Sequence, residues 1–121
     1  MKHLALYLAI GLISTLAIPS FASPRLDLEK AIVYREAGNY QEALPLFLQL
    51  SEKGYVAAQM NLAEMYFLGQ GLKKNNDTAL YWACKASESK EIRAHRFRIK
   101  LALQTISEHY KPRKCSEFLN K

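Results

Sequence analysis

Apolar positions recur at helical spacing through most of the chain, which predicts an all-α protein. No stretch keeps the strict alternation that is typical of a half-buried strand. The clearest boundary lies mid-chain, where Gly69 and Gly71 end one helix and Asn75 offers an N-cap to the next. The full pattern predicts helices near residues 25–37, 40–53, 56–68, 76–88 and 91–109, with a short segment near 113–120.

Small residues alternate with large aromatic residues on the two helices of the central segment, so that the pair can pack closely. This spacing resembles the Sel1-like repeat, a branch of the tetratricopeptide superfamily. The residues that carry the resemblance are Ala58, Leu62, Tyr66, Gly69, Gly71, Ala79, Trp82, Lys85, Ala86 and Glu88. Ala63, Leu72 and Asn75 stand where the family usually has Gly, Val and Asp. We interpret Tyr66 and Trp82 as core residues, with ligand stacking as the alternative.

A second, weaker copy of the pattern lies upstream. Its residues precede their counterparts by 32 positions in the first helix and by 36 in the second, because the turn at Gly38-Asn39 is shorter. The turn predicts a capping box formed by Asn39 and Glu42, and Pro45 predicts a kink in the helix that follows. The equivalent pairs are Ala31 and Ala63, Tyr34 and Tyr66, Ala43 and Ala79, Leu46 and Trp82, Leu50 and Ala86, and Glu52 and Glu88.

The predicted fold is therefore all-α: a short α-solenoid of two helix-turn-helix repeats closed by a C-terminal capping helix. A tetratricopeptide-like repeat is expected over 23–54, a Sel1-like repeat over 55–89, and the capping helix with its tail over 90–121. The capping helix carries two apolar arcs on opposite sides, so it should pack against the last repeat and against the tail. One arc contains Ile92, Ile99, Leu103, Ile106 and Tyr110, the other Ala94, Phe97 and Leu101, and the tail carries Phe118 and Leu119.

The first residues of the chain predict export. A short basic start precedes an apolar run over 4–18, Pro19 ends that run, and a small-x-small motif follows at 20–22. Residues 1–22 are therefore expected to be a signal peptide, and the mature chain should begin at Ser23 in the periplasm or outside the cell. The alternative is an uncleaved anchor, although the run is shorter than the roughly 20 residues that a membrane span needs.

Two cysteines, Cys84 and Cys115, remain in the mature chain. In an oxidising compartment an even count favours one disulfide, which would tie the tail to the second repeat. A reactive or metal-binding thiol is the alternative, but there is no C-x-x-C and no nearby His in the sequence.

The sequence gives little support to catalysis. The two histidines of the mature chain, His95 and His109, lie 14 residues apart on one predicted helix, about 21 Å along its axis. Such a separation rules out a shared metal ion. The usual nucleophile, metal and phosphate motifs are absent from the sequence, so we expect no catalytic residues, no metal and no cofactor.

Charge is divided unevenly along the chain. From Ser23 to Leu72 there are four basic and six acidic residues, a net of −2, whereas from Lys73 to Lys121 there are twelve basic and five acidic, a net of +7. Arg93, Arg96 and Lys100 share one side of the capping helix, and we call these three residues the basic stripe. The stripe is either a solvated face or a surface that steers an acidic partner. Nucleic acid is not expected as a partner.

The resemblance implies an adaptor or scaffold that binds a protein partner without chemistry of its own, and the first residues of the chain predict that it is exported. An acidic protein is one candidate partner and an anionic glycan another, and no stable membrane anchor is expected after signal cleavage. Two alternatives stay open: a cell-envelope or secreted factor that acts on or binds anionic cell-wall glycan, and a host-contact or virulence factor.

Overall fold

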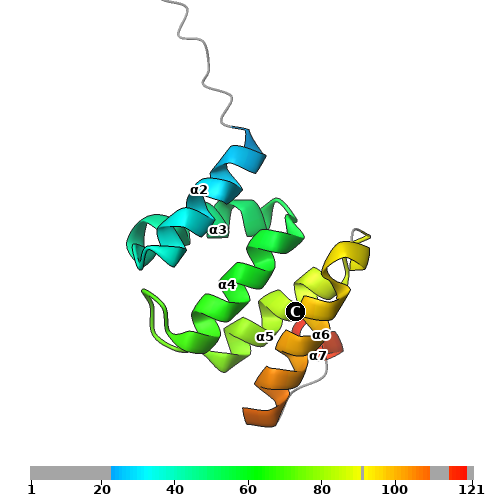
Figure 1. Cartoon of the computed structure of the whole chain (residues 1–121). Coiled ribbons are helices and arrows are strands. Elements are labelled where there is room, and N and C mark those ends of the chain that lie inside the picture. The colour runs from blue at the N-terminus through cyan, green and yellow to red at the C-terminus, as the bar shows by residue number, and fades with distance from the viewer. Residues whose placement is uncertain (1–22, 91, 110–114, 120–121) are drawn as a thin grey trace, which may run out of the picture.

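The computed structural model describes residues 23–90, 92–109 and 115–119. Every regular element in these ranges is a helix, which confirms the predicted fold class. Consecutive helices from α2 to α6 contact one another, and they follow each other across the molecule (Figure 1). The helices are α2 (Pro24–Glu36), α3 (Tyr40–Glu52), α4 (Val56–Leu68), α5 (Asn76–Ser87), α6 (Ile92–His109) and α7 (Cys115–Leu119). The predicted signal peptide, residues 1–22, lies outside the described residues.

Local sequence signals explain several of the helix ends. Pro24 occupies the first turn of α2, where its missing N–H costs nothing. Gly69 ends α4 in the left-handed conformation, and the side-chain oxygen of Asn75 caps α5 by accepting from the backbone N–H of Thr78 at 3.0 Å. The predicted capping box of α3 is wrong. Asn39 does precede that helix, but its backbone is not extended (ψ 65°) and its side chain makes no capping hydrogen bond.

The two repeats bury equivalent positions. In the first helix of each repeat, Ala31 and Ala63 are both fully buried, and in the second helix Ala43 and Ala79 are fully buried as well. Tyr34 and Tyr66 are both half-buried. The chain therefore uses the same contact positions twice, which is how stacked helix pairs build one continuous core.

The aromatic residues of the second repeat join two parts of this core. One buried cluster lies among α2, α3 and α4, and includes Phe47 and Leu62. A second lies among α4, α5 and α6, and includes Leu80. Tyr66 and Trp82 are half-buried and pack against both clusters, so these two residues connect the two parts of the core.

The loop of the second repeat packs closely against the first repeat at Gly71. Gly71 has a φ of 71°, and a Cβ atom placed on it would overlap the Cβ of Tyr40 at the start of α3. The side-chain amide of Gln41 donates to the carbonyl oxygen of Gly71 at 3.2 Å. Glycine at this position therefore meets both a conformational and a steric requirement.

The C-terminal helices differ from the prediction. Within the first arc of α6, Ile99 and Ile106 are buried as expected, because the second repeat covers them. The second arc is not covered: Phe97 is 77% exposed and Leu101 is 52% exposed. The tail helix α7 instead contacts α5, and its Leu119 packs against the buried cluster that includes Leu80 and Ile106. The side chains of Ile92, Ala94 and Phe118, and residue Tyr110, lie outside the described part of the chain.

Candidate functional site

A polar network links the first helices of the two repeats. Arg35 on α2 donates from Nη1 to Asn61 Oδ1 and to Glu64 Oε2 on α4, both at 2.8 Å. Its Nε donates to Gln70 Oε1 in the following loop at 2.9 Å. Only 16% of the Arg35 side chain is exposed, so these contacts fix it in place. Asn61 is oriented in turn by donating from Nδ2 to the carbonyl oxygen of Ala57 at 2.8 Å.

The same network extends to α6 through Glu64. Its second oxygen, Oε1, accepts a hydrogen bond from Arg98 Nη2 at 3.1 Å. Two guanidinium groups thus share one carboxylate, and the three side chains together carry a net charge of +1. The Arg98 side chain is 46% exposed, far more than that of Arg35, so the cation on α6 faces solvent.

An apolar groove lies beside this ion pair, between α4 and α6. Its volume is about 190 Å³, and the Glu64–Arg98 pair forms part of its edge. The exposed side chain of Phe97 precedes Leu101 by one helical turn on α6 and extends the apolar surface beyond the groove. The residues that complete the lining are Ala63, Phe67, Leu101, Ala102, Thr105 and Ile106.

The basic stripe lies on the other flank of α6. Arg96 and Lys100 are exposed, and the side chain of Arg93 lies outside the described residues. Each of Arg96 and Lys100 is two positions from Arg98, which is about 200° around a helix. The structure therefore separates the stripe from the groove. Arg98, which borders the groove, was missed because the sequence holds no local signal that it would meet Glu64.

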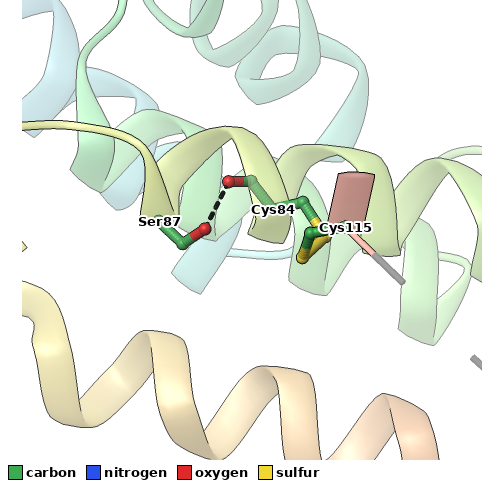
Figure 2. The surroundings of a disulfide bond; sticks show 3 residues. All are labelled: Cys84, Ser87 and Cys115. Carbon is green, nitrogen blue, oxygen red and sulfur yellow. Dashed lines mark hydrogen bonds between the residues drawn. A yellow bond between two sulfur atoms is a disulfide. The ribbon is translucent and has the colours of Figure 1, made fainter. Parts of the chain in front are cut away.

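The two cysteines form a disulfide that joins α5 to the start of α7 (Figure 2). The Cα atoms of Cys84 and Cys115 are 5.3 Å apart, and this is the pairing expected from the sequence. Cys84 is fully buried, and its carbonyl oxygen accepts a hydrogen bond from Ser87 Oγ at 2.6 Å. Neither sulfur is a free thiol, so the pair has a structural role in this state.

The described residues lack the arrangements that a metal site or a membrane-spanning helix needs. No group of three or more His, Cys, Asp or Glu side chains in these ranges is placed to hold a metal ion. His95 is half-buried on α6, and the side chain of His109 lies outside the described residues. In the same part of the chain, no helix combines the length and the apolar composition needed to cross a bilayer.

Stacked helix-turn-helix pairs with one continuous core define an α-helical repeat protein. The comparison with family models agrees, because residues 56–90 match the model described as Sel1 repeat. The match covers the second helix-turn-helix pair, and it supports the likeness of this chain to Sel1-like repeat proteins of the tetratricopeptide-like superfamily. Sel1 repeats generally mediate protein–protein interaction, and the family is generally non-catalytic. No curated protein and no solved structure matches the chain.

Proposed function

We propose that this chain is an exported, non-catalytic adaptor that binds a protein partner through the face formed by α4 and α6. One observation carries the proposal: an apolar groove, bordered by a half-exposed arginine, lies beside two exposed apolar side chains, Phe97 and Leu101. Exposed apolar surface of this kind, with a charged edge, is typical of an interaction site.

The proposed compartment is the periplasm or the extracellular space. The disulfide between Cys84 and Cys115 supports this part of the proposal, because such bonds persist in oxidising compartments. A disulfide also stabilises a small domain whose few helices bury only a small core.

Photo-crosslinking from the proposed face tests the function directly. The mature chain would carry a benzophenone amino acid in place of Phe97, and the same residue in place of Val33 as the control. Val33 is a comparable position, 62% exposed but on α2. Illumination in cell-envelope extract should give an identified protein adduct from position 97 and a weaker one or none from position 33.

Two results would count against the adaptor function. One is the absence of any protein adduct from either position, in extracts from growth conditions in which the chain is made. The other is retention of the protein by purified cell-wall glycan alone, with turnover of that glycan, which would favour the alternative of a glycan-directed factor.

A further inference from the structure

The groove between α4 and α6 combines apolar walls with a positive edge. Its apolar side chains come from both helices, and its volume is about 190 Å³. A buried apolar cavity of roughly 150 Å³ holds a benzene molecule. The groove is thus large enough for one phenylalanine or leucine side chain, while its open side leaves room for the backbone that would carry that side chain.

Arg98 is the charged group at this edge that can change partners. It donates one hydrogen bond to Glu64 at 3.1 Å, whereas an arginine has five N–H donors in total. An exposed ion pair of this kind contributes little to stability. If Arg98 turns toward an incoming carboxylate, Glu64 still keeps its 2.8 Å contact with the more buried Arg35. The exchange therefore leaves no charge without a counterion.

The positive charge of α6 favours a binding partner that carries negative charge. The helix contains four basic residues and one acidic residue, Glu108, so its net charge is +3 with histidine neutral. This field attracts acidic segments and repels basic ones, and its effect falls as salt is added.

We propose that the groove binds an acidic protein segment, with one large apolar side chain of that segment between Phe67 and Leu101 and a neighbouring carboxylate on Arg98. The inference rests on the proposed adaptor function and adds the chemistry of the partner. It assigns recognition to Arg98 rather than to the basic stripe, because Arg98 has apolar walls beside it and the stripe lies on the opposite flank of α6.

The test uses three synthetic peptides and the isotope-labelled chain with its disulfide intact. The first peptide has a central Phe flanked by Glu residues, the second has Ala in place of Phe, and the third has Lys in place of Glu. Amide chemical shifts detect binding even at millimolar Kd and report which residues respond. Only the first peptide should shift the amides around Phe67, Leu101 and Ala102 in a saturable manner.

Matched variants separate the groove from general electrostatics. Arg98→Gln should weaken binding of the acidic Phe peptide about tenfold, as expected for a lost charge-assisted hydrogen bond. Arg96→Gln removes the same charge from the same helix and should change Kd by less than about twofold. Leu101→Asp should abolish saturable binding, whereas Val33→Asp, a similar change at an exposed position on α2, should not.

Each outcome decides the proposal. Weaker binding in Arg98→Gln and loss of saturable binding in Leu101→Asp, with dispersed spectra that show intact folding, support it. If Leu101→Asp loses its dispersed spectrum, Leu101→Gln replaces it and should weaken binding in the same way. Shifts confined to Arg96 and Lys100, equal binding of the Ala peptide, or no shift at millimolar peptide would each overturn it. So would a dimer of the free chain that the peptide does not dissociate, since a second copy would then cover the groove.

The same variants distinguish this inference from the adaptor function. If the protein partner captured by crosslinking binds Arg98→Gln and Leu101→Asp as tightly as the unmodified chain, the groove assignment fails and the adaptor function stands. If the peptide binds as expected but no protein partner is captured, the groove assignment stands and the adaptor function fails.

Discussion

Breaking the disulfide should cost most of the stability of the C-terminal part of this chain. The bond between Cys84 and Cys115 spans a sequence separation of 31 residues. For a loop of that size the chain-entropy relation gives about 3.7 kcal/mol at 25 °C. The helix that it anchors, α7, has five residues, and an isolated helix of that length is not stable in water. Reduction should therefore also release Leu119 from the cluster around Ile106.

Urea denaturation of two single variants and of the reduced chain measures this contribution. Cys115→Ser changes a half-buried residue and should lower the free energy of unfolding by about 3–4 kcal/mol. Cys84→Ser breaks the same bond but also places a hydroxyl at a fully buried position, which should cost about 1 kcal/mol more. Reduction of the unmodified chain changes no residue and should match Cys115→Ser. All three should show a larger m-value, because the unfolded chain is no longer cross-linked.

Two results would refute the reasoning. Thiol titration of the unfolded, unreduced protein should find no free thiol, and two free thiols would show that the bond does not form. A Cys115→Ser variant as stable as the oxidised chain would show that α7 and the loop before it contribute nothing to the folded state.

Four further predictions follow from positions elsewhere in the chain. Mass spectrometry of the exported protein should find Ser23 at its N-terminus, and an intact Met1 on a membrane-bound product would contradict cleavage after Ala22. Gly71→Ala should lower the free energy of unfolding by on the order of 2–3 kcal/mol, because strain in the left-handed conformation adds to overlap with Tyr40. Gly54→Ala should show the strain alone, about 1 kcal/mol, since a Cβ there meets nothing within 4 Å. Trp82→Ala should cost about 2–3 kcal/mol in chemical denaturation, below the value for a fully buried aromatic, and a stable mutant that merely loses partner binding would place Trp82 in a ligand site. Replacing the whole basic stripe with Gln should leave melting nearly unchanged, and under the groove hypothesis it should slow partner association without abolishing binding; complete loss of binding would move recognition to the stripe.

Helix positions could be predicted from this sequence because their signals are local. Glycine in the left-handed conformation, as at Gly69, and an N-cap such as Asn75 act within one turn of the chain. The repeat could be recognised in the sequence because equivalent positions carry residues of similar size. Ala31 and Ala63 occupy equivalent contact points, and a small residue at each lets the neighbouring helix approach closely.

The site could not be predicted, because it depends on how helices distant in sequence are placed. Glu64 and Arg98 are 34 residues apart, and they meet only because α6 packs against α4 as well as α5. The exposed arc of α6 was misread for the same reason. Helical period shows that Phe97 and Leu101 share a face, but it does not show which element covers that face. Which face of α6 is covered depends on where α7 packs, and α7 contacts α5.

The contacts of α7 also explain why an apolar surface stays open on α6. In a stacked helical array the last repeat normally presents a polar outer face to solvent. Here α7 contacts α5 and is tied to it through Cys84, and Phe97 and Leu101 on α6 remain exposed. Both side chains are more than half exposed, so polar residues at these positions would cost the core little. Their apolar character beside Arg98 is therefore better explained by a partner than by the stability of the fold, and Phe97→Ala should weaken partner binding while leaving the free energy of unfolding nearly unchanged.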